Sequence, residues 1–205
     1  MFIDVRNCRG GRDSTHGVKE VKQVRRGARY LAVFFSAFFI FAVFYLFFVR
    51  EQGNFCAVTP GEAYRSAQLN RGEFMYFIRK YHLRSVINLR GAHPERSWYR
   101  EELKACKAMG VEHYDVTLSA SSDPGPGEQE KLINIFKNAP RPVLMHCMSG
   151  ADRAGLASAM WKVLVDREPK SEAEKQLSIF FGHLPVGSTY AMDSFFARWE
   201  PGPGL

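Results

Sequence analysis

PVLMHCMSGADRAG, residues 142–155, joins an apolar run of strand length to a helical pattern that continues to residue 166. A short loop between a buried strand and a helix turns successive backbone N–H groups into one concavity. The positive end of the helix dipole lies behind such a loop, so an anion is held by both. The stretch therefore predicts a strand at 142–146, an anion-binding loop, and a helix over 153–166.

Three residues of this loop carry chemistry. The donors that hold an anion also stabilise a thiolate, which makes Cys147 a nucleophile near neutral pH. Arg153 follows six residues later, and its guanidinium binds two phosphate oxygens in a fork that lysine cannot match. Gly150 permits a close approach of the backbone to the anion. A buried, inert cysteine beside a surface arginine is the competing interpretation.

Strand-like and helix-like stretches alternate on both sides of this loop. Strands are expected at 85–90 and 111–118, and helices at 95–109 and 128–139. Two further helices are expected, near 171–182 and 190–199. Residues 119–128, SASSDPGPGE, form a loop rich in turn residues. The alternation predicts an α/β fold with a mainly parallel central sheet flanked by helices.

The N-terminal part has a different character. Residues 30–49, YLAVFFSAFFIFAVFYLFFV, contain no charged side chain, and twenty helical residues extend roughly 30 Å, the thickness of a bilayer core. We therefore predict a basic cytoplasmic tail at 1–29, one transmembrane helix at 30–49, and a single catalytic domain at 50–205. A cleaved signal peptide is the alternative. The tail holds eight Lys/Arg and three Asp/Glu, so positive residues place the N-terminus in the cytoplasm and the domain on the outer, periplasmic side.

Composition excludes one class of function and leaves the redox state open. Of the net charge of +7, the tail carries +5, so the catalytic part is nearly neutral and lacks the basic footprint of a nucleic-acid-binding domain. The four cysteines show no metal-binding spacing. In an oxidising compartment, Cys56 and Cys106 are candidates for a disulfide, although single cysteines such as Cys106 are more often buried and free.

The sequence HCMSGADR resembles the His-Cys-x5-Arg signature of the cysteine-based protein tyrosine and dual-specificity phosphatases. The smaller pieces YRSAQ (64–68), INLR (87–90), QLS (176–178) and GH (182–183) resemble the compact bacterial dual-specificity-like branch. The resemblance covers most of residues 55–198. It implies a protein-tyrosine-phosphatase-like fold and an enzyme without a metal or other cofactor, acting on a phosphorylated protein or a small phosphomonoester.

The resemblance also implies roles for individual residues. Cys147 would form a cysteinyl-phosphate, and His146 would orient the loop. Arg90 and Arg65 are supporting residues that widen the positive field, although a structural ion pair is an equal alternative for Arg90. The equatorial phosphate oxygens would be bound by the Arg153 guanidinium and by the backbone N–H groups of Met148, Ser149, Gly150, Ala151, Asp152 and Arg153. For the Asp152 side chain, we expect a local contact that fixes Arg153.

The general acid is less clearly marked. In the family, an aspartate on a mobile upstream loop protonates the leaving group, and Asp123 is the aspartate in the loop before the helix that leads to the catalytic strand. Its alternative role is to start a turn with Pro124, and Glu128 or Glu130 would then serve as the acid. Ala154 stands where relatives carry Ser or Thr, so hydrolysis of the intermediate is expected to be slow.

Three functions fit these features. The first is a phosphatase acting on phosphotyrosine, with phosphoserine/threonine as further substrates and phosphoinositides or other small phosphates as an alternative. The second is a pseudophosphatase that binds phosphorylated ligands with little turnover. The third, a structural membrane protein with a vestigial loop, is disfavoured because the key loop residues are all present.

Overall fold

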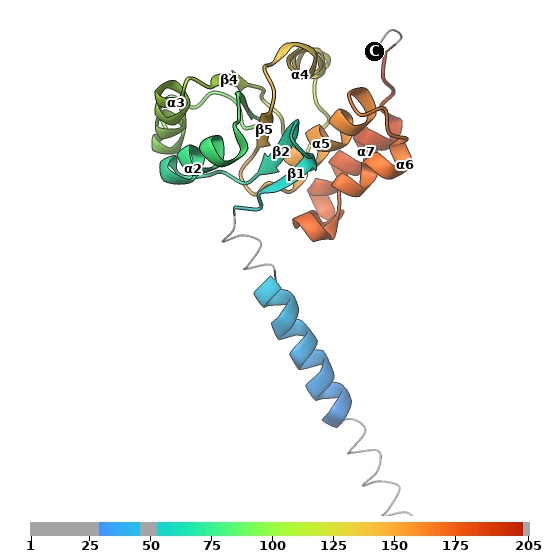
Figure 1. The fold of residues 1–205 in the computed structure, drawn as a ribbon. Helices are drawn as coiled ribbons and strands as arrows, with labels where there is room; N and C mark the ends of the chain where they lie inside the picture. Colours follow the sequence, from blue (N-terminus) through green and yellow to red (C-terminus); the bar gives the residue numbers. More distant parts are fainter. Residues whose placement is uncertain (1–28, 46–52, 203–205) are drawn as a thin grey trace, which may run out of the picture. The chain divides into compact units, whose positions relative to one another are not determined.

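The computed structural model describes residues 29–45 and 53–202 (Figure 1). The chain divides into two units, residues 1–45 and residues 46–205. Residues 1–28 of the predicted tail lie outside the described residues.

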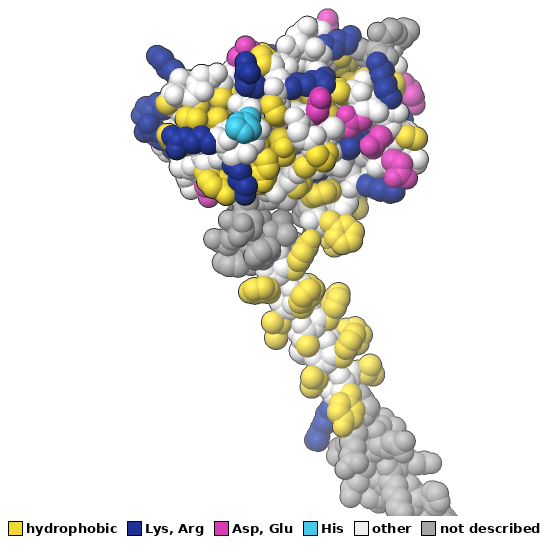
Figure 2. All heavy atoms as spheres, viewed as in Figure 1, with side chains coloured by type: hydrophobic (Ala, Val, Ile, Leu, Met, Phe, Trp, Pro, Cys, Tyr) yellow, Lys and Arg dark blue, Asp and Glu magenta, His cyan; other side chains and the backbone are white. Residues whose placement is uncertain are grey.

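Residues 29–45 form a helix, and its apolar side chains are exposed along it (Figure 2). No helix within 29–45 or 53–202 is both long enough and apolar enough to cross a membrane. The predicted transmembrane helix covers 30–49, of which the structure describes residues 30–45. Positions 46–49 of that prediction lie outside the described residues.

The second unit is built on a five-stranded sheet with the order β1-β2-β5-β3-β4. The strands are β1 Cys56–Thr59, β2 Ala63–Ser66, β3 Ser85–Asn88, β4 Glu112–Asp115 and β5 Val143–His146. Only β1 is antiparallel to its neighbour, and β2, β5, β3 and β4 run parallel. The predicted α/β fold with a mainly parallel sheet is confirmed, and β5 and β3 are the predicted strands at 142–146 and 85–90.

Helices cover both faces of the sheet because its central strands are apolar on both sides. Val86 and Leu144 face a core shared with α2 (Arg71–Tyr81) and α3 (Ser97–Met109). Their neighbours Ile87 and Met145 face the opposite core. That core is completed by α4 (Pro126–Asn138), α5 (Asp152–Leu164) and α7 (Tyr190–Arg198), and Figure 1 shows the two groups of helices on either side of the strands.

One predicted helix and one candidate disulfide need correction. The segment expected to be helical over 171–182 contains only the short α6 (Lys170–Ala173) and two 3₁₀ turns, Glu174–Gln176 and Ile179–Phe181. Gly182 ends the second turn with φ +80°, a backbone conformation suited to glycine. Cys56 and Cys106 are both free.

Candidate active site

The catalytic loop, residues 147–151, connects the end of β5 to the start of α5. β2 and β3 flank β5 as parallel neighbours, so their carboxyl ends meet at this loop. Cys147 is only 1% exposed, and its Sγ accepts a hydrogen bond from the Gly150 N–H at 3.2 Å. The loop thus turns back on its cysteine, as expected for an anion-binding turn.

Gly150 is required for a reason that the sequence did not reveal. Its φ is +72°, and a Cβ added there would lie 2.6 Å from the Ala67 nitrogen and 2.7 Å from the Ser66 carbonyl carbon. The close approach that the structure shows is to the end of β2, and the expected approach to the anion stays a prediction. Any side chain would push the loop off the sheet.

Arg65, on β2, is a clamp beneath the loop. It is fully buried, and its Nη2 donates to the carbonyl oxygens of Gly150 at 2.7 Å and Ala151 at 2.9 Å. Its Nη1 donates to the backbone and side-chain oxygens of Gln176. In a trans peptide the N–H points opposite to the carbonyl. The carbonyls drawn toward Arg65 therefore turn the N–H groups of Ala151 and Asp152 to the other side of the loop. Burial lowers the pKa of Arg65 to about 10.

Arg153 lies at the start of α5, and its guanidinium makes few contacts. Nη1 is 3.5 Å from the Leu118 carbonyl oxygen, and the buried Nε has no hydrogen-bond partner. Among the residues that the structure describes, Arg153 forms no ion pair with a carboxylate. Its positive charge is therefore available to an anion.

Asp152 does not fix Arg153, contrary to our expectation. Its Oδ1 lies 2.7 Å from Nδ1 of the buried His183, whose Nε2 lies 2.9 Å from Asp193 Oδ2 on α7. Burial alone would lower the pKa of His183, but its contacts with the two aspartates outweigh burial and raise it. This triad ties the start of the catalytic helix to α7.

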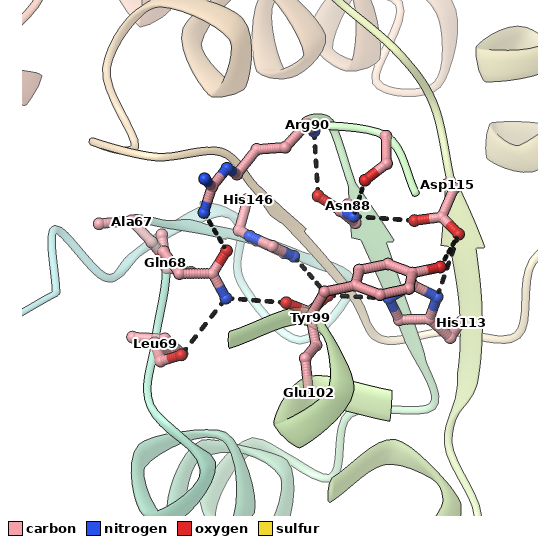
Figure 3. A network of polar contacts seen from close by, with 12 residues as sticks. Ala67, Gln68, Leu69, Asn88, Arg90, Tyr99, Glu102, His113, Asp115 and His146 are labelled. Carbon is pink, nitrogen blue, oxygen red and sulfur yellow. Dashed lines mark hydrogen bonds and ion pairs between the residues drawn. The ribbon is translucent and has the colours of Figure 1, made fainter. Parts of the chain in front are cut away.

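A buried carboxylate on α3 organises the other side of the loop (Figure 3). Glu102 Oε1 lies 2.8 Å from Nε2 of both His146 and His113, and its Oε2 accepts from Gln68 at 2.8 Å. Burial alone would raise the pKa of Glu102, but His146, followed by the hydrogen bonds from His113, His146 and Gln68, holds it well below its usual range. The ionised carboxylate therefore fixes the imidazole of His146, which directly precedes the nucleophile.

Glu102 is the functional residue that sequence reasoning missed. The buried positions of α3 are Tyr99, Glu102, Ala105 and Cys106, which follow helical spacing. A glutamate inside an apolar stripe is the signal that would have found it, because a buried carboxylate needs hydrogen-bonding partners.

Arg90 extends from the end of β3 toward the same edge of the sheet. Its guanidinium carbon lies 3.6 Å from the centre of the Trp98 ring, and Nη1 donates to Gln68 Oε1 at 2.9 Å. Burial, followed by the positive charge of Arg153, lowers the pKa of Arg90. The predicted structural ion pair is not formed, since within 29–45 and 53–202 no carboxylate pairs with Arg90.

Asp123 is not drawn into the site in this structure. Its exposed carboxylate pairs with Arg198 of α7 at 2.8 Å. Of the alternative acids, Glu128 accepts the Thr117 N–H at 2.8 Å and Glu130 is exposed on α4. The loop itself adjoins the site, because the Leu118 carbonyl at its start contacts Arg153.

Ala154 is fully buried next to Arg153. The nearest hydroxyl along the helix, that of Ser158, donates to the Ala154 carbonyl at 2.6 Å. Because this hydroxyl is hydrogen-bonded to the backbone, it does not replace the missing Ser or Thr hydroxyl.

Comparison with known proteins agrees with this geometry. The sequence profile of the tyrosine phosphatase family matches residues 49–171. Among solved structures, the core catalytic domain of the PP-IP phosphatase SIW14 from S. cerevisiae is similar, with a TM-score of 0.59 and 21% identity over 72% of this chain and 85% of that one. P. aeruginosa TpbA has a TM-score of 0.50 and 18% identity, covering 68% and 81% of the two chains. PTPMT1 in complex with PI(5)P has a TM-score of 0.54 and 15% identity, covering 70% and 95%.

Proposed function

The chain belongs to the tyrosine phosphatase family, and from this premise we propose that it hydrolyses phosphomonoesters through a cysteinyl-phosphate intermediate. The observation that carries the proposal is the arrangement of the loop. Cys147 Sγ accepts from the Gly150 N–H, while Arg65 holds the carbonyls of Gly150 and Ala151 on the opposite side. Arg153 supplies a guanidinium without a carboxylate partner among the described residues.

In the first step, the Cys147 thiolate attacks phosphorus and the P–O bond to the leaving group breaks. The equatorial oxygens are held by the loop N–H groups and by Arg153, whose interactions strengthen as charge builds up in the transition state. The leaving oxygen takes a proton from a general acid. In the second step, water attacks the phosphocysteine, the S–P bond breaks, and inorganic phosphate leaves with the thiolate restored.

We propose Asp123 as the general acid. This requires the ion pair with Arg198 to open, which is a small cost because exposed ion pairs contribute at most about 1 kcal/mol. Asp123→Asn is expected to lower kcat/KM, which reports the first step, by about 100-fold or more on phenyl phosphate, and much less on p-nitrophenyl phosphate, whose leaving group needs little protonation. Glu128→Gln is the matched control. If this variant shows a larger loss on phenyl phosphate relative to p-nitrophenyl phosphate than Asp123→Asn does, the acid is Glu128.

The substrate proposed first is phosphotyrosine in proteins, with phosphoserine/threonine as further substrates. TpbA has been crystallised with pTyr, which supports this class, whereas the names of SIW14 and of the PTPMT1 complex point to inositol pyrophosphates and phosphoinositides. A panel of phosphopeptides, phosphoinositides and soluble inositol phosphates, compared by kcat/KM, would rank them.

A binding protein without turnover is the second candidate, favoured by Ala154 and by the engaged carboxylate of Asp123. The full-length chain is therefore assayed for phosphate release from p-nitrophenyl phosphate beside Cys147→Ser. The enzyme proposal predicts a loss of activity by several orders of magnitude in the variant. Equal, slow release by both proteins would exclude it.

The cytoplasmic N-terminus and outer catalytic domain stay predictions that rest on the charge of the tail. Fusing the C-terminus to a reporter that is active on only one side of the membrane would test them.

A further inference from the structure

A second guanidinium stands beside the one that serves the reacting phosphate. β3 and β5 are parallel and in register, with Asn88 opposite His146, and the Leu89 N–H donates to the His146 carbonyl at 2.9 Å. Cys147 directly follows His146, and Arg90 follows Asn88 by two positions. Arg90 is therefore placed at the same edge of the sheet as the nucleophile.

The side chain of Arg90 is held before any ligand arrives. Its guanidinium stacks on the Trp98 ring. It also donates to Gln68 Oε1, as Figure 3 shows. Gln68 is itself fixed, because its Nε2 donates to Glu102 and its backbone N–H donates to the Met148 carbonyl at 3.2 Å. An arginine ordered in advance loses little side-chain entropy when it binds an anion.

The acidic charge that acts on Arg90 is that of Glu102, which is already engaged by His146, His113 and Gln68. Within the described part of the chain, neither Arg90 nor Arg153 has a carboxylate partner. The positive charge of Arg153 is among the factors that lower the pKa of Arg90, so the two cations repel each other. Arg153, the loop N–H groups and the helix dipole already suffice for one phosphate, which leaves Arg90 for a further anionic group.

We propose that Arg90, stacked on Trp98 beside the catalytic loop, binds a second phosphate group of the substrate. Among the substrates considered for the proposed phosphatase, this favours the small-phosphate alternative over phosphotyrosine in proteins: a small molecule or lipid headgroup that carries two phosphates, one cleaved at Cys147 and one held at Arg90. This inference rests on the proposed phosphatase function, because it takes the loop as the site of the first phosphate.

The test measures binding, so that it does not depend on turnover. Full-length Cys147→Ser is titrated by calorimetry with myo-inositol 1-phosphate, with myo-inositol 1,4-bisphosphate, and with dioctanoyl phosphatidylinositol 4-phosphate as the lipid form. Each titration is repeated after adding Arg90→Gln, and after adding Arg84→Gln as the control. Arg84 is an exposed arginine at the opposite end of the same strand region, so both variants remove one positive charge.

We expect the bisphosphate to bind about 10-fold or more tightly than the monophosphate, as one charged hydrogen bond allows. Arg90→Gln should abolish this ratio and Arg84→Gln should preserve it. Tighter binding of the lipid form than of the free bisphosphate, lost in Arg90→Gln, supports the same site with a lipid source. If Arg90→Gln destabilises the fold, Arg90→Lys, which keeps the charge but not the planar stacking, is expected to reduce the ratio.

Equal affinities for the two inositol phosphates would overturn the proposal. Equal weakening of both ligands by Arg90→Gln would also overturn it, and would assign Arg90 to the reacting phosphate. Failure of the phosphatase function is seen separately, as an absence of Cys147-dependent release from p-nitrophenyl phosphate.

Discussion

Replacing Arg65 by methionine should cost both stability and activity, because one buried guanidinium supports the whole catalytic loop. Methionine keeps a long apolar side chain but removes four hydrogen bonds, two to the loop and two to Gln176. A hydrogen bond to a charged group contributes about 1.5–3 kcal/mol. The loss is offset in part because burial of the guanidinium is itself unfavourable, as its lowered pKa shows. We expect a net loss of about 3–5 kcal/mol, because each buried acceptor left without a donor costs about 1–3 kcal/mol.

The loss of activity follows from the geometry of the peptides. Without Arg65, the Gly150 carbonyl loses its charged donor, while the Ala151 carbonyl keeps the Gly155 N–H at 2.8 Å. The peptide plane between Gly150 and Ala151 is then freer to rotate and to take the Ala151 N–H away from the phosphate. Losing one preorganised donor of this kind costs about 100- to 1,000-fold in kcat. Arg65→Met should therefore lower kcat/KM for p-nitrophenyl phosphate by about 100-fold or more, even where the protein is fully folded.

Two measurements check this prediction. Urea unfolding, followed by tryptophan fluorescence, gives the change in the free energy of unfolding. Steady-state kinetics without urea, at a temperature where both proteins are folded, give kcat/KM. Arg84→Met is the control, because its exposed side chain has no contact with the loop. If Arg65→Met keeps kcat/KM within about threefold of the wild type, the loop does not depend on the clamp and the reasoning is wrong.

Three further changes test other features. Gly150→Ala is expected to abolish detectable activity and lower the melting temperature, because φ is +72° and the new Cβ would lie 2.6 Å from the Ala67 nitrogen; normal kinetics would contradict this. Ala154→Ser should raise the turnover rate and shrink the burst of released alcohol in rapid-mixing experiments, and a wild type without a burst would show that the second step is not slow. The raised pKa of His183 means that its protonated form stabilises the fold fully below about pH 6.5, its unfolded value, and that this contribution is lost as pH rises through the higher folded value. His183→Gln should flatten the melting temperature over that pH range, and an unchanged profile would contradict the assignment.

The parts of the fold predicted best are those in which local pattern and burial agree. β3 and β5 are short apolar runs, and α3 and α4 follow helical spacing. α5 is buried on most of its residues and was placed by the loop that precedes it. The positions of all five elements were correct to within a few residues. The hairpin of β1 and β2 was missed because β2 carries a buried arginine, Arg65, where apolar residues are expected. Its burial is explained by acceptors that are distant in the sequence: the loop carbonyls, 85 and 86 positions away, and two oxygens of Gln176, 111 positions away.

The site shows the same division. Cys147, Gly150 and Arg153 could be assigned because fixed spacing on one loop determines their relative positions. The contact of Asp152 with His183 could not be assigned, because His183 follows irregular 3₁₀ turns that have no clear sequence pattern. Asp193 lies on the predicted helix α7 and reaches Asp152 only through His183. The proposed role of Asp123 likewise depends on a surface contact with Arg198 that spacing does not reveal.

The shared carboxylate of Glu102 has a consequence for how this sequence tolerates change over evolution. One carboxylate oxygen contacts both His146 and His113, and the other accepts from Gln68. Replacing the glutamate therefore removes the acceptor of three polar side chains at once. Replacements at these four positions should show strong epistasis, each harmful alone and milder in combination. Among homologues, we expect them to covary as a block.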